Sequence, residues 1–316
     1  MLDWRAAVCA AAMLLFTTAI HATPPPPRVV ASLPPLHGLV AGVTEGIAEP
    51  DLLLTAGSSP HAHHMRPSQA RQIAAADLIV WIGPGMESFL TAAVDARGAD
   101  AVVIEAAALP GMYLRGTRDG SQWETHSHDH GHGTVHDHHA HEVDYHLWLD
   151  IDNARRIVEA TADALAALDP DRSEAYRANA ERMEARLTAL DAALRERLAP
   201  VRDIPYVVFH DAYHYFEARY GLSPAGSVTI HPEQAPGARH LRDLRRRIQN
   251  LEAVCVFSEP QFEPAIVASL IRGTEVRRGE LDPLGFGIEP GPDAYFEWME
   301  RLAENFRACL YTAARR

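Results

Sequence analysis

The most unusual feature of this sequence is a dense run of histidines. Eight of the 18 histidines fall in HSHDHGHGTVHDHHAH: His126, His128, His130, His132, His136, His138, His139 and His141. Neutral imidazole is a common ligand for zinc, copper and nickel, and two interspersed aspartates add oxygen donors. Val135 is the only large apolar residue of the run, so we expect residues 125–141 to form a disordered loop that binds several ions weakly. The alternative is a solvated spacer whose histidines are incidental.

Three isolated histidines are better candidates for a tight site. His61 follows a predicted strand at 51–54, His146 opens HLWLD directly after the histidine run, and His210 ends a predicted strand in VVFHDAY. Short loops at strand ends are where α/β sheets place functional groups. Each histidine alone is more often a hydrogen-bonded core or surface residue. Since the first two belong to one predicted lobe and the third to another, they could converge in a cleft.

A fourth ligand is expected because zinc prefers tetrahedral coordination. Asp282, in GELDPLG, is the best carboxylate candidate because it follows a predicted strand of the second lobe. Its alternative role is a turn aspartate before Pro283. Three imidazoles with one oxygen would suit Zn²⁺.

Two halves of the chain show the same alternation of apolar runs and amphipathic stretches. In the first half we predict strands at 28–32, 51–54, 77–82 and 101–104, with helices at 36–43, 67–76 and 86–96. In the second half we predict strands at 206–209, 227–230, 253–258 and 275–281, with helices at 211–220, 238–250, 264–271 and 293–309. This rhythm predicts an α/β fold of two Rossmann-like lobes with mostly parallel sheets.

A long helix is predicted between the two halves. Met183, Leu187, Leu190, Leu194 and Leu198 recur at helical spacing, and Asp169 and Pro170 suit the N-cap and the first helical position. We therefore predict an N-terminal lobe at 28–168, a connecting helix at 169–200 and a C-terminal lobe at 201–316, with the metal site in the cleft between the lobes. An ordinary surface helix of one lobe is the alternative. A single connecting helix would limit hinge opening.

The N-terminus has the pattern of a secretory signal peptide. Arg5 precedes an apolar run at 6–20 that ends in small residues around Ala22, so we predict that residues 1–22 are removed and that the protein is periplasmic. A retained anchor is the alternative, although the run is shorter than a bilayer span. The formal net charge of −13 argues against nucleic acid as a partner. We expect a monomer.

Two cysteines remain after the predicted cleavage. Cys9 leaves with the signal peptide, and Cys255 and Cys309 form an even pair in an oxidising compartment. A disulfide is the economical interpretation. Thiolate metal ligands are the alternative, which is disfavoured because neither cysteine has a CxxC or CxxH spacing.

Several sequence blocks together resemble one protein family. The blocks HAHHMRPSQARQIAAADLIVWIGPGMESFL, HLWLD, VVFHDAYHYFEARYGL, PEQAPGARHL, CVFSEPQF and GELDPLG are similar to the zinc-uptake substrate-binding proteins of bacterial ABC transporters, the ZnuA type. The resemblance covers essentially the whole mature chain. It implies two α/β lobes joined by a long helix, a metal between them, a His-rich loop and a disulfide between Cys255 and Cys309. It also implies His61, His146, His210 and Asp282 as ligands.

The resemblance leaves one ligand open. Some zinc members have a glutamate directly before the first histidine, where this chain has Pro60, so we expect Asp282 or a water as the fourth ligand. Manganese-binding relatives have a carboxylate at the position of His210, which favours zinc here. His63 and His64 are expected to be neighbours of the site, and His214 and His231 have no assigned role.

The function implied is a periplasmic zinc-binding protein that delivers Zn²⁺ to the membrane permease of an ABC-type importer. It would not be an enzyme. A zinc-dependent hydrolase is an alternative, but the sequence has no HExxH motif, and catalytic zinc needs an open position with a general base. Proteins that bind manganese or another divalent metal, and a periplasmic zinc buffer, are further alternatives.

Overall fold

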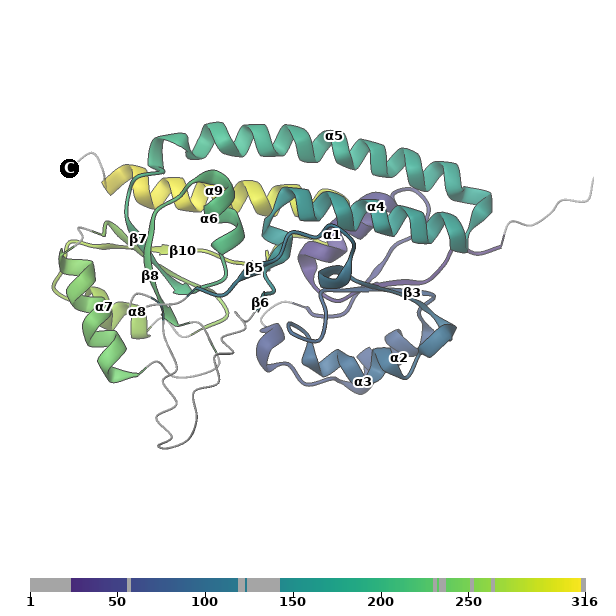
Figure 1. Cartoon of the computed structure of the whole chain (residues 1–316), viewed down its shortest axis with the longest axis horizontal. Coiled ribbons are helices and arrows are strands. Elements are labelled where there is room, and N and C mark those ends of the chain that lie inside the picture. The colour runs from purple at the N-terminus through teal and green to yellow at the C-terminus, as the bar shows by residue number, and fades with distance from the viewer. Residues whose placement is uncertain are drawn as a thin grey trace, which may run out of the picture.

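A computed structural model describes residues 24–55, 58–118, 123, 143–229, 232, 237–250, 253–262 and 265–313 (Figure 1). The predicted signal peptide at 1–22 and the predicted His-rich loop at 125–141 lie outside the described residues. None of the helices in these described ranges is long and apolar enough to span a bilayer.

The first half of the chain forms a parallel four-stranded sheet in the order β2-β1-β3-β4. Its strands are β1 (Val29–Ala31), β2 (Asp51–Leu52), β3 (Leu78–Trp81) and β4 (Val102–Glu105). All four residues of β3 are apolar and buried, as expected for a strand covered on both faces. The helices are α1 (Pro34–Val43), α2 (Pro67–Ala75) and α3 (Thr91–Asp95). Prolines occupy the first positions of α1 and α2, where no amide hydrogen bond is lost.

The second half forms another parallel sheet, in the order β10-β9-β7-β8. Its strands are β7 (Tyr206–His210), β8 (Pro224–Thr229), β9 (Cys255–Ser258) and β10 (Arg277–Glu280). The helices beside it are α6 (His214–Tyr220), α7 (Ala238–Asn250) and α8 (Ala265–Ile271). A short antiparallel pair, β5 (Arg115–Gly116) and β6 (Val143–Asp144), flanks residues 119–142. The predicted α/β fold with two parallel sheets is confirmed.

A layer of helices runs across both sheets. It consists of α1, α4 (Ile151–Leu168), α5 (Ser173–Leu198) and α9 (Ala294–Ala313), and we call it the helical layer. α5 extends over both halves with α9 beneath it (Figure 1) and packs against α4, α9 and α1. One continuous apolar core includes Leu78 of the first sheet and Phe257 of the second. The predicted connecting helix is therefore confirmed, and the alternative of a surface helix on one lobe is wrong.

Several element boundaries differ from the prediction. α5 begins at Ser173, because Pro170–Arg172 form a 3₁₀ turn in which the Asp169 carboxylate accepts hydrogen bonds from Arg172 and Tyr176. The predicted helix at 86–96 is a 3₁₀ turn followed by the short α3. The domain boundaries at 28, 168, 200 and 316 stay a prediction.

Cys255 and Cys309 form a disulfide that joins the start of β9 to the last turns of α9. The bridge fixes the C-terminal helix to a central strand of the second sheet. It also excludes both thiols as metal ligands.

Candidate metal site

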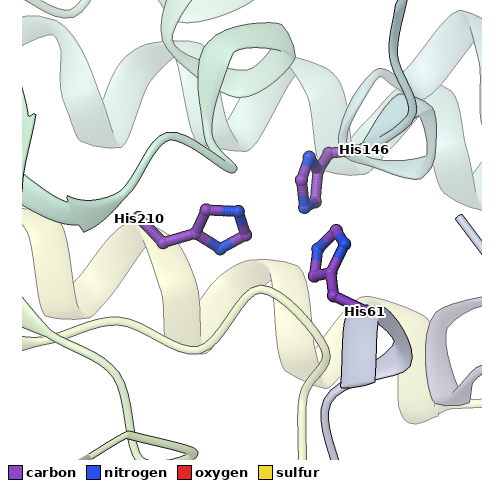
Figure 2. Close-up of side chains that lie close together, drawn as sticks. All are labelled: His61, His146 and His210. Atoms are coloured by element: carbon purple, nitrogen blue, oxygen red, sulfur yellow. The ribbon is translucent and has the colours of Figure 1, made fainter. Parts of the chain in front are cut away.

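His61, His146 and His210 converge between the two sheets. Their ligand nitrogens all lie within 4.8 Å of one another, and the ring centroids are 4.9 to 5.5 Å apart. His210 approaches from one side and the other two rings from the opposite side (Figure 2). Zinc binds imidazole nitrogens at about 2.0–2.1 Å, so small ring rotations would bring all three onto one ion.

His61 is positioned by a short turn that follows the first sheet. It lies in the 3₁₀ turn Pro60–Ala62, where the buried Pro60 fixes the start. The Ser59 hydroxyl oxygen accepts a hydrogen bond from the backbone N–H of His61 at 3.3 Å. The His61 side chain is half-buried, whereas His146 and His210 are buried.

His146 is oriented by a carboxylate on its own segment. Its Nδ1 lies 2.8 Å from Oδ1 of Asp144, which also accepts the backbone N–H of His146 at 3.0 Å. A proton on Nδ1 directed at Asp144 leaves Nε2 free to bind metal, the usual arrangement of a metal-binding histidine. The ring packs against Trp148, whose indole N–H donates to the carbonyl of Pro283 across the cleft.

His210 faces a buried glutamate. It is the last residue of β7, and its Nδ1 lies 3.7 Å from Oε2 of Glu259, which directly follows β9. The other oxygen of Glu259 accepts a hydrogen bond from the hydroxyl of Tyr213 at 3.2 Å. Burial, followed by the nearby charge of Asp282, raises the pKa of Glu259 well above its usual range.

Glu259 was missed by the sequence reasoning. It stands in CVFSEPQF, directly after a predicted strand, and the strand-end rule that selected the histidines could have selected it as well. The rule gave no reason to prefer one acidic residue among many. The cavity beside the histidines is lined by Glu259, Gln261 and Pro283 among others.

Asp282 has hydrogen-bond partners on both carboxylate oxygens. Oδ1 accepts from Gln261 Nε2 at 2.7 Å and from the backbone N–H of Leu284 at 2.9 Å, and Oδ2 accepts from the N–H of Phe286 at 2.7 Å. Burial raises the pKa of Asp282 above its usual value, although these hydrogen bonds oppose the shift. This is the bonding of a turn aspartate. Asp282 is not part of the three-histidine group, and its role as a ligand stays a prediction.

The neighbouring histidines have other contacts. Nε2 of His63 lies 2.9 Å from Gln69 Oε1, and its ring packs against Phe89. His64 is exposed. Nδ1 of His214 lies 3.9 Å from Asp144, and burial, with the charges of nearby arginines, lowers its pKa to about 4. His214 is therefore neutral near pH 7. His231 lies outside the described residues.

Arg118 ties the stem of the segment at 119–142 to the second lobe. Its guanidinium bonds the carboxylates of Asp211 and Glu217 and stacks on the Trp123 ring at 3.7 Å. Asp211 directly follows His210, so the stem begins beside the site. Burial raises the pKa of Asp211 to about 6 although the charge of Arg118 opposes that shift.

The sequence matches a known family along almost all of the described region. The family described as "zinc-uptake complex component A periplasmic" (ZnuA) matches residues 29–309. This chain belongs to the ZnuA family. The resemblance identified from the sequence blocks is thereby confirmed.

Individual ZnuA relatives agree with this assignment. The chain is 39% identical over 304 residues to the high-affinity zinc uptake system protein ZnuA of Brucella abortus, covering 89% of this chain and 91% of that protein. It is 36% identical to the ZnuA of Yersinia pestis, with the same coverage of both chains.

The fold is similar to that of a ZnuA crystal structure, with a TM-score of 0.74 at 22% identity, covering 90% of this chain and 99% of that chain. The periplasmic zinc-binding protein TroA of Treponema pallidum gives 0.74 at 21% identity, with the same coverage.

Proposed function

We propose that this protein binds one Zn²⁺ between its two lobes and delivers it in the periplasm to the membrane permease of an ABC-type zinc importer. The observation that carries the proposal is the convergence of His61, His146 and His210 from two different sheets. Family membership supports the transport role, since the ZnuA relatives are named for high-affinity zinc uptake.

The donor set favours zinc over harder cations. Neutral imidazoles are good ligands for Zn²⁺, whereas Mn²⁺ prefers carboxylate and carbonyl oxygens. We propose Asp282 or a water molecule as the fourth ligand. Asp144 and Glu259 then act through the rings: each faces the Nδ1 atom of a histidine and directs its Nε2 towards the ion.

Binding without catalysis is the better description of this site. A catalytic zinc needs a general base beside its open position. Glu259 is close to the site, but its free oxygen faces the Nδ1 atom of His210, on the far side of that ring from the proposed ion. Trp148, Phe262 and Leu284 give part of the cavity an apolar lining.

The remaining parts of the proposal rest on sequence. Residues 1–22 would direct export and be removed, and the histidines at 126–141 would collect zinc near the site with lower affinity. The chain would act as a monomer of two lobes, at 28–168 and 201–316, joined by the helix at 169–200.

Calorimetric zinc titration of the mature chain tests the site assignment. We expect His61→Ala to abolish the tightest binding event, and deletion of residues 125–141 to remove only weaker events. His64→Ala is the matched control, because His64 lies three residues from His61 and is exposed. Loss of the tight event on loop deletion, with His61→Ala unchanged, would mean that the site lies elsewhere.

Zinc-limited growth tests the transport role. A host that lacks its own zinc-uptake binding protein should regain growth with the parent chain and its matching permease, and not with His210→Ala. Tight zinc binding without any restoration of growth would favour a zinc buffer.

A further inference from the structure

Helix α7 has a charge opposite to that of the protein as a whole. The chain carries a formal charge of −13, yet the thirteen residues of α7 contain Arg239, Arg242, Arg245, Arg246 and Arg247 with Asp243 as the only acid. All 29 basic residues of the chain are arginine. Arginine presents a planar fork of donors that fits phosphate oxygens. α7 is therefore a local cationic surface on an anionic protein.

Three of these arginines form one exposed stripe. Arg239, Arg242 and Arg246 are all exposed, and the spacing i, i+3, i+7 puts them on one face of a helix. The opposite face carries Leu244 and Ile248, which are buried in the core of the second lobe. The stripe thus faces solvent. Arg246 pairs with the half-buried Asp243, and no ion pair is described for Arg239 or Arg242 within the described ranges.

The cationic surface continues beyond α7. Arg245 donates to the carbonyls of Ser269 and Arg272 at 3.0 and 2.7 Å, which holds the end of α8 against α7. The exposed side chain of Arg272 therefore lies near the same helix. We call Arg239, Arg242, Arg246 and Arg272 the arginine face.

The arginine face lacks the apolar centre of a typical protein interface. The large hydrophobic side chains that are exposed in the described ranges are Val102, Tyr113, Leu114, Leu168 and Tyr311, none of which belongs to α7, α8 or β10. Specific protein interfaces usually have a buried core enriched in aromatic residues. A surface with arginines and no such anchor fits a partner that is recognised by charge alone.

We propose that the arginine face adsorbs to the phosphate groups of an anionic phospholipid bilayer. The phosphates of a bilayer move laterally, so they can match the spacing of the arginines without a shaped pocket. α7 lies on the outer side of the second lobe, away from the first lobe (Figure 1). Its first turn is next to β8, since Nε2 of His240 lies 3.0 Å from the carbonyl of Ser227.

Vesicle co-sedimentation tests this proposal independently of zinc. The mature chain, kept metal-free with a chelator, is mixed with phosphatidylcholine vesicles that contain about one quarter phosphatidylglycerol, and with pure phosphatidylcholine vesicles. We expect binding to the anionic vesicles only, and binding that falls as salt rises, because exposed charges are screened within about 10 Å at 0.1 M salt.

A triple variant assigns the binding to the stripe. Each arginine at a lipid surface contributes about fivefold in affinity, so R239Q/R242Q/R246Q should bind the anionic vesicles on the order of 100-fold more weakly. The control R71Q/R177Q/R301Q removes the same charge from exposed arginines of α2, α5 and α9 and should bind within a few-fold of the parent. Unchanged zinc titrations would show that both variants are folded.

Two results would overturn the proposal. Equal weakening by both triple variants would mean that net charge, and not the stripe, controls binding. No binding of the parent chain to anionic vesicles at low salt would exclude the bilayer and leave an acidic protein surface as the partner.

Discussion

Two of the contacts between the lobes are built from different chemistry. In the helical layer they share a continuous apolar core, and Arg219 of α6 bonds Asp150 and Asp152 at the start of α4 and Asp191 of α5. At the candidate metal site they meet through His61, His146 and His210, with buried carboxylates behind two of the rings. The first contact exists without metal, whereas the second needs an ion to complete it.

This difference indicates how the protein responds to zinc. A shared core of close-packed side chains resists relative motion, so the lobes are held together whether or not zinc is bound. We therefore expect zinc to order the loops around the three histidines and to move the lobes little. Changes to the helical layer should alter stability, and changes to the site should alter affinity.

Arg219→Gln should have the largest effect on stability. The Arg219 side chain is 9% exposed, and its loss leaves Asp150 without its cation and Asp191 with Arg195 alone. Removing one partner of a buried pair costs about 3–5 kcal/mol, and the exposure of Asp152 lowers our expectation to about 2–3 kcal/mol. Urea unfolding of the metal-free protein measures this loss in the free energy of unfolding. The zinc affinity should change less than about threefold.

Arg195→Gln is the matched control for that experiment. Arg195 pairs with the same Asp191 within α5 and donates an exposed hydrogen bond to the carbonyl of Arg219, so its loss should cost no more than about 1 kcal/mol. A similar loss of stability in the two variants would mean that the ion pairs of Arg219 with α4 and α5 contribute nothing to stability.

His210→Ala should have the largest effect on affinity. Loss of one of four zinc ligands removes about 3 kcal/mol of binding, which is more than 100-fold in Kd. His214→Ala, four residues away and outside the group, should change Kd less than about threefold. If both variants bind zinc equally well, the three-histidine site is not the tight site.

Changes to the two carboxylates behind the rings should have smaller effects. Asp144→Asn and Glu259→Gln keep the size of the side chain but weaken the orientation of His146 and His210, at a typical cost of about 10–100-fold in metal affinity.

Asp282→Asn separates the candidates for the fourth ligand. A loss of more than about 100-fold for Asp282→Asn, with Glu259→Gln unchanged, would identify Asp282 as a ligand and remove Glu259 from the site.

The smallest predicted effect is the response of the helical layer to acid. Burial would raise the pKa of Asp191, but hydrogen bonds and charges from Arg219 and Arg195 hold it below its usual value. The pKa of Asp152 is also lowered, chiefly by Arg219. A carboxylate whose pKa is lower in the folded protein than in the unfolded chain stabilises the folded state at pH values above its unfolded pKa, which is near 3.9 for aspartate. This stabilisation is lost as the pH falls through the pKa of the folded state. The stability difference between parent and Arg219→Gln should therefore shrink below about pH 4. If the stability difference between parent and Arg219→Gln stays constant from pH 5 to 3, the ion pairs of Arg219 with Asp191 and Asp152 do not cause it.

Much of the fold could be predicted because its signals are local. The buried strand LIVW at 78–81 is a continuous apolar run, and the leucines of α5 repeat at helical spacing over about three turns. The three histidines could be selected because strand ends are marked by the end of such runs. The 3₁₀ turn at Pro170–Arg172 was missed because helix and 3₁₀ turn share the same start signals.

The electrostatic parts of the site could not be predicted in the same way. In the sequence, nothing distinguishes Glu259 from the other acidic residues, which number 42 in all. Only the packing of Tyr213 and His210 around it shows that it is buried. The hydrogen bonds of Asp282 to the amides of Leu284 and Phe286 depend on the path of a turn. Arg219 and Asp150 are 69 residues apart, and no local pattern connects them.

Trp148 offers a natural optical probe of zinc occupancy. Its buried indole ring packs against His146 at 5.3 Å between centroids, and its N–H donates to Pro283 of the other lobe. An ion on His146 would change the electric field at this ring directly. Because we expect the lobes to move little, a sensor that reads the distance between dyes on the two lobes should give a weak signal. In a variant whose other tryptophans are replaced by phenylalanine, the emission of Trp148 should report the same event without any label.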